Sequence, residues 1–388
     1  MKVIFAESHN LDRPDPLGSH HYIRHFHEAG WDPLWLGPAV SPMHLFKPDR
    51  LNRDRFRIWR EGGRKVEGID WLVPFTALFY YRAPLLDSLY AGRNQYRFCL
   101  PPLKGQLERR GFAKTDLLWC AGPAAYSLLD LVPHRLSCLR IADRLDRFSR
   151  IPASVNRLQA ELIGRVDLVF ATSRSLQKWA ARHRDGGVYY LPNGVSDIFF
   201  TEYPEPPDDF PRTDAPVAVY AGTVDERFDL QALQLAVRQA REVHFLVIGP
   251  VTANKLIPGL EELKGEANFT LLGPKRYSLI PAYLGKCSAG LIPFVESRLT
   301  EAVNPIKYYE YLACGLPVAA SPLPELTGMG GPLYPYRRAE DLAEAVRLAV
   351  KAGGKEKAEN REYAAGQTWQ SRFRDAEALI KAALERKA

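Results

Sequence analysis

The hydrophobic residues of this chain gather in short runs, and segments of helix length with mixed polarity separate these runs. In the first half the runs occupy residues 1–7, 117–120, 139–142, 168–171 and 188–191. The first run leads into a polar loop broken by prolines, after which a helix is expected over 20–29, capped by Ser19 and ended by Gly30. Strands that alternate with helices in this way predict a doubly wound α/β domain with a parallel sheet.

The same alternation restarts after a segment of different composition. Residues 196–216 are rich in proline and acidic residues, which is typical of a linker. Further strands are then expected at 217–221, 244–248, 269–272, 290–293 and 317–320. Near the C-terminus, 371–388 carries an apolar stripe that is too narrow for a helix to stand alone. We therefore predict a domain over 1–195, a linker over 196–216, a second domain over 217–368 and a helix over 369–388 that packs on a domain.

Composition narrows the class of protein. A chain of 388 residues exceeds one ordinary hydrophobic core, and its 46% hydrophobic and 25% charged residues exclude wholesale disorder. Five scattered cysteines without a CxxC pair indicate neither a disulfide framework nor a zinc site. The chain has no apolar run of about 20 residues and no secretory signal, so a cytoplasmic location is expected. The net charge of +7 favours an anionic partner, such as nucleic acid, a membrane surface or a phosphorylated substrate.

The segment 304–318 is the most informative part of the chain. It begins as a helix would, with Asn304 as the N-cap and Pro305 at the first helical position. Lys307 and Glu310 are three residues apart and share one face, where the helix N-terminus and the lysine attract an anion and the carboxylate can accept from a ribose diol. The alternative is a surface ion pair worth only ~0.3 kcal/mol. Spacing alone leaves both interpretations open.

This segment, together with 291–294 and 318–320, strongly resembles the C-terminal signature of group 1 glycosyltransferases of the GT-B fold. Members with an Asn-Pro-x-Lys-x-x-Glu-Tyr core, such as proteins of teichuronic-acid and capsule biosynthesis, are the most similar. Further landmarks follow in the family's order at 167–173, 191–195, 220–223 and 247–250. The resemblance implies two Rossmann-like domains that face a cleft, with the acceptor on the first and a nucleotide-sugar on the second. It also implies that the last helix crosses back to the first domain.

The resemblance further implies roles for individual residues of the donor site. Glu310 should bind the ribose and Lys307 the diphosphate, within the segment that also holds Asn304, Pro305 and Ile306. Arg227 and the backbone at Gly222 are expected as second phosphate contacts, because a diphosphate requires cations and a close approach of the backbone.

Two more residues and one departure complete the comparison with the family. Arg276 and Tyr277 are expected to frame the base of the nucleotide. Many retaining members carry a glutamate eight positions before the second one, but here that position is Ala302, and the neighbouring Glu301 would point elsewhere. The retaining mechanism is therefore not carried over to this chain.

Asp143 and Asp146 follow the predicted strand 139–142, at the end of a strand where doubly wound folds place their ligands. An inverting transfer needs a base that deprotonates the acceptor hydroxyl, and a carboxylate can serve. The segment is similar to the one that holds the catalytic aspartate of the xanthan-type glucuronosyltransferase, which implies Asp146 as the base and leaves Asp143 as an alternative. The alternative is a structural role, in which both carboxylates form ion pairs with nearby arginines in a solvated loop, namely Arg140, Arg144 or Arg147.

Gly18, Ser19 and His20 follow the first strand and are candidates for the acceptor side. Glycine permits close approach of the backbone, and a serine cap presents N–H groups to a phosphate or sugar oxygen. His20 could be an acceptor ligand or an alternative base, although a histidine in the first turn of a helix is more often structural. The stretch is not GxGxxG, which counts against a dinucleotide site here.

Residues 47–65 hold six arginines and two lysines, and 75–98 is rich in tyrosine and phenylalanine. One interpretation is an interfacial patch that meets anionic headgroups and a lipid-linked acceptor. The other is a solvated basic strand pair beside an ordinary aromatic core. No known motif supports binding of nucleic acid.

The function expected from these features is a metal-independent GT-B glycosyltransferase without a cofactor. It would move a sugar from a nucleotide diphosphate sugar, with UDP favoured, to a saccharide or lipid-linked saccharide in the synthesis of a surface polysaccharide. No Asp-x-Asp metal motif is present, and helix and lysine charges can neutralise the leaving diphosphate. An aspartate base would make the transfer inverting. Two alternatives stay open, a nucleotide-sugar epimerase of the same fold and a scaffold that binds glycan or nucleotide without turnover.

Overall fold

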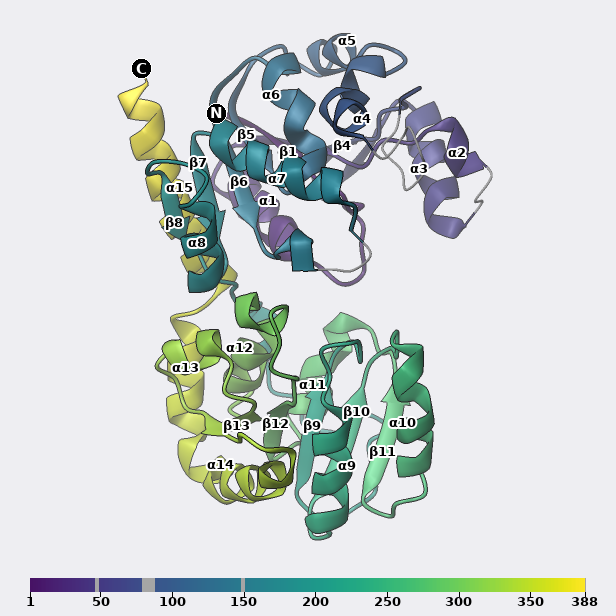
Figure 1. The fold of residues 1–388 in the computed structure, drawn as a ribbon, viewed down its shortest axis with the longest axis vertical. Coiled ribbons are helices and arrows are strands. Elements are labelled where there is room, and N and C mark those ends of the chain that lie inside the picture. The colour runs from purple at the N-terminus through teal and green to yellow at the C-terminus, as the bar shows by residue number, and fades with distance from the viewer. Residues whose placement is uncertain (46–48, 79–87, 148–150, 388) are drawn as a thin grey trace. The chain divides into compact units, whose positions relative to one another are not determined.

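The computed structural model describes residues 1–45, 49–78, 88–147 and 151–387 of the chain. The chain forms two compact units, one made of residues 1–192 with 373–388 and the other of residues 193–372 (Figure 1). Each unit contains one sheet in which parallel strands alternate with helices, so the predicted α/β class is confirmed.

The sheet of the first unit has the order β3-β4-β2-β1-β5-β6-β7-β8. Its ladders are parallel except for the antiparallel pair β3–β4. The core lies around the central strands, where the ring of Phe5 stacks 5.1 Å from Trp119 and 6.2 Å from Trp35. The strands are β1 (Lys2–Ala6), β2 (Asp32–Leu36), β3 (Arg64–Val66), β4 (Ile69–Leu72), β5 (Thr115–Cys120), β6 (His134–Ile141), β7 (Leu168–Ala171) and β8 (Val188–Tyr190).

Helix α15 (Trp369–Arg386) reaches the first unit from the far end of the sequence and is yellow in Figure 1. Phe373 packs edge-on at 4.9 Å against Phe26, and the Trp31 indole donates to Glu377 Oε1 at 3.0 Å. These contacts bury the apolar stripe that the sequence indicated. The other helices of the unit are α1 (Gly18–Glu28), α2 (Pro42–Leu45), α3 (Arg50–Arg60), α4 (Leu89–Asn94), α5 (Leu103–Glu108), α6 (Leu128–Leu131), α7 (Ala153–Arg165) and α8 (Arg174–Ala180).

Two local expectations for the first unit are wrong. Helix α1 begins at Gly18 with Leu17 as its N-cap, and Ser19 lies inside the first turn, where its hydroxyl donates to Glu7 instead of capping the helix. Residues 50–60 of the basic segment form helix α3 rather than a strand pair, because Asp49 accepts from Asn52 N at 2.7 Å and starts a helix. Lys47 and residues 79–87 of the aromatic segment lie outside the described residues.

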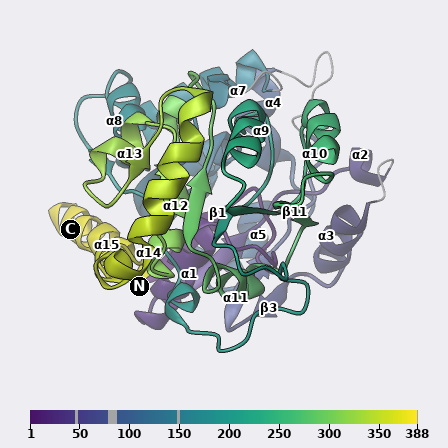
Figure 2. The same cartoon turned by 90° about the horizontal axis from the view of Figure 1, so that it is seen from below.

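The sheet of the second unit has the order β11-β10-β9-β12-β13-β14, and all of its ladders are parallel. Helices α12 and α14 pack against each other beside it (Figures 1 and 2). The strands are β9 (Val217–Ala221), β10 (His244–Ile248), β11 (Phe269–Gly273), β12 (Ala289–Ile292), β13 (Val318–Ala320) and β14 (Tyr334–Pro335). The helices are α9 (Leu230–Gln239), α10 (Ile257–Leu263), α11 (Ile280–Leu284), α12 (Ile306–Ala313), α13 (Pro324–Gly328) and α14 (Leu342–Ala365).

Residues 196–216, which the sequence indicated as a linker, belong to the second unit. Phe199 is fully buried in the core of that unit, and Asp209 accepts from the Tyr283 hydroxyl at 2.6 Å. The crossings between the units lie at 192–193 and 372–373 instead.

Candidate functional site

Each sheet has one position where the order of its strands reverses. In the first unit the chain builds outward from β1 through β2 on one side and from β5 on the other, and in the second unit it does so from β9 and from β12. Ligands of open α/β sheets bind beyond the carboxyl ends of the strands at such a switch point. Each unit therefore has one place where a ligand is expected, and the predicted residues can be located relative to it.

Two glycines follow β9 and β10 at the switch point of the second unit. Gly222 donates to Ile248 O at 2.7 Å and Gly249 donates to Gly273 O at 2.8 Å, with φ angles of 153° and 143°. A Cβ at position 249 would overlap the carbonyl of Gly222. Only residues without a side chain fit this edge, and they leave backbone open to close approach by a ligand.

Helix α12 sets Lys307 directly over Gly222. The hydroxyl of the buried Tyr311 accepts from Ala221 N at 2.9 Å and donates to Leu291 O at 3.3 Å, which fixes the helix to the ends of β9 and β12. A Cβ at position 222 would overlap Cε and Nζ of Lys307, and that Nζ lies 5.5 Å from the centroid of the Tyr220 ring. The observed position of the Lys307 side chain therefore requires a glycine at position 222.

A second cation lies in the electrostatic range of Lys307. Burial lowers the pKa of Lys307, Glu310 and Asp225 oppose that shift, and Arg227 reinforces it. Asp225 holds the Arg227 guanidinium, with Nε 3.0 Å from Oδ1, and that guanidinium lies 5.7 Å from the centroid of the Phe294 ring. Because two cations repel each other here, an incoming anion would stabilise both.

Glu310 is buried one turn after Lys307, with 7% of its surface exposed. Its Oε1 accepts from the Tyr277 hydroxyl at 2.9 Å, and the Tyr277 ring lies 5.4 Å from Phe199. Burial raises the pKa of Glu310, whereas Lys307 and the hydroxyl of Tyr277 oppose the shift. Lys307, Glu310 and Tyr277 thus form one group, while the side chain of Arg276 is exposed beside Tyr277. Their contacts with a nucleotide-sugar stay predictions.

The start of α12 differs from the expectation. The helix begins at Ile306, Pro305 is its N-cap residue, and Asn304 does not cap it. The Asn304 side chain is buried and accepts from Asn193 N at 3.0 Å, so its amide is used inside the protein. Contacts of Asn304, Pro305 and Ile306 with a ligand stay predictions.

Ala302 and Glu301 face different surroundings, as expected. Ala302 is 4% exposed, whereas the neighbouring Glu301 lies on the surface. Glu301 therefore does not share the buried environment of position 302, eight residues before Glu310.

The aspartates of the first unit lie in the loop after β6. Asp146 binds Arg144 through both carboxylate oxygens, with Arg144 Nε at 2.8 Å from Oδ1, and the guanidinium lies 4.9 Å from the centroid of the Trp179 ring. This contact is an ion pair of the kind expected if Asp146 has a structural role. Asp143 accepts from Gln159 through its backbone carbonyl at 3.5 Å. A role of either carboxylate as a base stays a prediction.

The acceptor-side candidates after β1 are engaged within the protein. His20 is buried, its Nδ1 accepts from Leu17 N at 3.1 Å and its Nε2 donates to Asn10 O at 2.9 Å. Burial lowers the pKa of His20, so the ring stays neutral, and both its nitrogens are used to hold the loop. Gly18 makes room for Arg140, because a Cβ at position 18 would lie 2.8 Å from Nη1 of that residue. These positions favour the structural interpretation.

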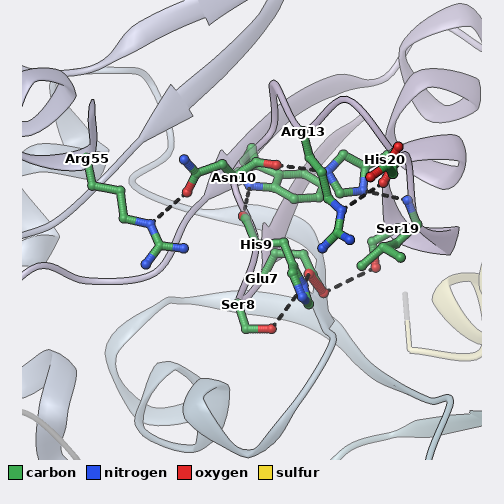
Figure 3. A network of polar contacts seen from close by, with 11 residues as sticks. Glu7, Ser8, His9, Asn10, Arg13, Ser19, His20 and Arg55 are labelled. Atoms are coloured by element: carbon green, nitrogen blue, oxygen red, sulfur yellow. Dashed lines mark hydrogen bonds and ion pairs between the residues drawn. The ribbon is translucent and has the colours of Figure 1, made fainter. Parts of the chain in front are cut away.

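Glu7 and His9, which were not among the residues predicted from the sequence, lie at the carboxyl end of β1 (Figure 3). The Nδ1 atom of His9 is 3.2 Å from Glu7 Oε2, and the two side chains are 41% and 6% exposed. The signal available in the sequence was their position directly after a central strand.

The described ranges contain neither a candidate metal site nor a candidate membrane-spanning helix. No group of three or more His, Cys, Asp or Glu side chains there could hold a metal ion. None of the helices in those ranges is both long enough and apolar enough to cross a membrane.

The chain is similar to known glycosyl transferases in sequence and in fold. Residues 215–351 match the family model of group 1 glycosyl transferases. A protein of Bacillus subtilis (strain 168), provisionally named as the teichuronic acid biosynthesis glycosyltransferase TuaH, is 27% identical over 314 residues, which are 77% of each chain.

Solved structures match over nearly the whole chain. The sucrose-phosphate synthase of Thermosynechococcus elongatus has a TM-score of 0.72 at 15% identity and covers 99% of both chains. Anabaena HepE in complex with UDP and glucose has a TM-score of 0.66 at 15% identity and covers 98% of this chain and 99% of its own. The predicted GT-B fold is thereby confirmed. The chain is a glycosyltransferase of the GT-B fold that carries the group 1 domain over residues 215–351.

Proposed function

We propose that the enzyme transfers a sugar from a UDP-sugar to a saccharide or lipid-linked saccharide in the synthesis of a surface polysaccharide. The observation that carries the proposal is the position of Lys307 over Gly222, one turn before the buried Glu310. The Anabaena protein of the same fold was solved with UDP and glucose, and the Bacillus relative is named for teichuronic acid biosynthesis. Both support the donor class and the kind of product.

Different residues would hold the two parts of the donor: cations would bind the diphosphate, and a carboxylate would form hydrogen bonds with the ribose. Lys307 and Arg227 would bind the diphosphate at the glycine edge, because phosphate oxygens attract cations and close backbone. Glu310 would accept hydrogen bonds from the ribose, and Tyr277 and Arg276 would lie near the base. Partial burial of this group strengthens each electrostatic contact relative to the same contact in water.

The chemistry asks the protein to stabilise the leaving diphosphate and to accept a proton. Two cations beside the phosphates would supply the first requirement without a metal or a cofactor, so transfer should continue in the presence of EDTA. The second requirement belongs to an inverting transfer, in which a base deprotonates the acceptor hydroxyl. Asp146 could serve only after it parts from Arg144, to which both of its oxygens are bound.

We also propose that the acceptor is met at an anionic membrane surface on the cytoplasmic side. Helix α3 carries four exposed arginines and the half-exposed Leu51. Basic residues near an anionic lipid surface each contribute about 1 kcal/mol. The arginines are Arg50, Arg53, Arg57 and Arg60.

The experiment is a thermal-shift panel with UDP, GDP, ADP, CMP and NAD. A ligand at 100 times its dissociation constant adds about 2.7 kcal/mol to the free energy of unfolding. We expect a shift with UDP that is lost in Lys307→Ala and kept in Lys264→Ala, a matched change of an exposed lysine paired with Glu261. No shift with any nucleotide would overturn the donor site.

Turnover then separates the candidates. Release of UDP from a UDP-sugar only when a saccharide acceptor is present identifies a transferase and excludes an epimerase. Binding of UDP without any turnover of the sugar nucleotide would favour the scaffold.

A further inference from the structure

The loop after β1 is held in place at His9 and Asn10. The Trp35 indole donates to His9 O at 2.9 Å, His20 Nε2 donates to Asn10 O at 2.9 Å, and Arg55 Nε donates to Asn10 Oδ1 at 2.7 Å (Figure 3). Three elements therefore hold a short segment at the switch point of the first sheet. The backbone of His9 is fixed, although 41% of its side chain is exposed.

The carboxylate of Glu7 contacts the His9 ring at Nδ1 and orients it. The two oxygens of this buried carboxylate are used separately, with Oε1 accepting from Ser19 Oγ at 3.3 Å and Oε2 lying 3.2 Å from His9 Nδ1. An ionised carboxylate only accepts hydrogen bonds, so Nδ1 carries the proton and Nε2 keeps its lone pair. None of the described side chains forms a hydrogen bond with Nε2.

The arrangement does not match that of a serine nucleophile with its histidine and carboxylate. Ser8 Oγ lies 3.2 Å from Nδ1 of His9, the nitrogen that faces Glu7. A histidine that activates a serine does so through the nitrogen opposite its carboxylate. Proton acceptance at Nε2 from a molecule outside the protein is the chemistry left to this pair.

We infer that His9 is the catalytic base that takes the proton of the acceptor hydroxyl, and that Glu7 is its positioning residue. The inference rests on the proposed function and adds the acceptor-side group to it. The acceptor oxygen forms a bond to the anomeric carbon while the bond from that carbon to the diphosphate oxygen breaks, and its electron pair leaves with UDP. The hydroxyl proton moves to Nε2, and Glu7 stabilises the imidazolium until the proton passes to water.

The other candidates in this unit are less available for the same step. His20 has both ring nitrogens engaged with backbone, and Asp146 has both oxygens on Arg144. The carboxylate of Glu7 is buried, and its contacts with Ser19 and His9 offset the cost of that burial.

The first experiment records the ¹⁵N shifts of the His9 ring in the wild-type protein and in Glu7→Gln. We expect the neutral ring to carry its proton on Nδ1 in the wild-type protein, and this preference to weaken in the variant, because an amide can donate a hydrogen bond as well as accept one. Protonation on Nε2 in the wild-type protein, or the same tautomer preference in both proteins, overturns the pair. Other ionisable groups near this network are His20 and Arg24 on α1 and Arg55 on α3.

The second experiment measures UDP release from the UDP-sugar that the thermal-shift panel and turnover select. We expect His9→Gln to lower kcat by about 10²- to 10⁴-fold, the usual contribution of a general base, with an unchanged thermal shift by UDP. His25→Gln is the matched control, because His25 Nδ1 pairs with the exposed Glu28 at 2.8 Å. Near-normal turnover of His9→Gln together with a large loss in Asp146→Asn would assign the base to Asp146 and overturn the inference.

Glu7 needs a readout that a structural role would not move. In Glu7→Gln we expect kcat to fall while KM and the thermal shift by UDP stay unchanged, because the carboxylate acts on the proton transfer through His9 and not on binding. An unchanged kcat in a folded variant contradicts the positioning role. If the wild-type protein did not bind UDP at all, the proposed donor site would be wrong, and this result is distinct from a failure of the His9 assignment.

Discussion

Asn193 and Asn304 are joined by two hydrogen bonds although 111 residues separate them. The backbone N–H of Asn193 donates to Asn304 Oδ1 at 3.0 Å, and its side-chain amide donates to Asn304 O at 2.7 Å. Asn304 stands two residues before α12, so this pair fixes the approach to the helix that carries Lys307 and Glu310.

Asn304→Ala should destabilise the protein, because it leaves the buried N–H of Asn193 without its acceptor. An unsatisfied buried donor costs about 1–3 kcal/mol, and denaturant unfolding should show a loss of this size. Asn254→Ala, at an exposed position of the same unit, is the control. Equal stability of both variants would contradict the structural role of Asn304.

Gly222→Ala should abolish UDP binding while the protein stays folded. The new methyl group would occupy the position of Lys307 Cε and Nζ and push the ammonium away from the glycine edge. Isothermal titration with UDP measures the loss, and far-UV circular dichroism checks the fold. Gly354→Ala is the comparison, because a Cβ there meets nothing within 4 Å. Normal affinity of Gly222→Ala would mean that UDP does not need Lys307 at this edge.

Glu310→Gln should weaken UDP more than 2′,3′-dideoxy-UDP. The carboxylate is expected to accept from the ribose hydroxyls, and a hydrogen bond to a charged group contributes about 1.5–3 kcal/mol. The wild-type protein should therefore prefer UDP by at least about tenfold, and the variant should lose most of that preference. Competition titrations give both ratios. A preference that persists in Glu310→Gln would place the ribose elsewhere.

UDP binding should weaken as the pH rises toward the lowered pKa of Lys307. Burial is the largest influence on that pKa and shifts it below the ordinary value of 10.5, so the ammonium loses its proton earlier than a surface lysine does. The charged form exists below the pKa, and affinity is therefore retained on the acid side and lost on the basic side. Titrations from pH 7 upward on the wild-type protein and Lys307→Arg check this, because the arginine should remove the dependence.

Charge reversal on α3 should release the enzyme from anionic vesicles. Replacing Arg53 and Arg57 by glutamate removes two exposed positive charges and adds two negative ones. We expect sedimentation with vesicles of phosphatidylglycerol and phosphatidylcholine to fall at least tenfold, and UDP binding to persist. Vesicle binding that survives the reversal would place the membrane contact on another surface.

The parts of the fold that the sequence predicted are those that local pattern determines. The strands at 168–171, 217–221 and 244–248 coincide with β7, β9 and β10, because an uninterrupted apolar run suits a strand buried on both faces. Helix α3 was missed although its eleven residues are amphipathic with a helical period, because they hold few apolar positions among many arginines and the start of the helix depends on the side chain of Asp49.

The site divides in the same way. Lys307 and Glu310 belong to one short motif, and the sequence alone predicts them as a pair on one helix face. The cap at Asn304 failed because its partner, Asn193, lies 111 residues away. His9 escaped notice because its significance depends on Glu7 beneath it and on the side chains that hold its loop, and these contacts appear only after the chain has folded.

The first unit is made of two stretches of sequence, 1–192 and 373–388, and this affects the order in which the units can fold during translation. Phe26 and Trp31 leave the ribosome early. Their partners on α15, Phe373 and Glu377, are synthesised only after the whole second unit. Until then an apolar surface of the nascent first unit is open to solvent and to chaperones that bind such surfaces. The second unit, which is contiguous, can finish folding first, so the order of completion is the reverse of the order of translation.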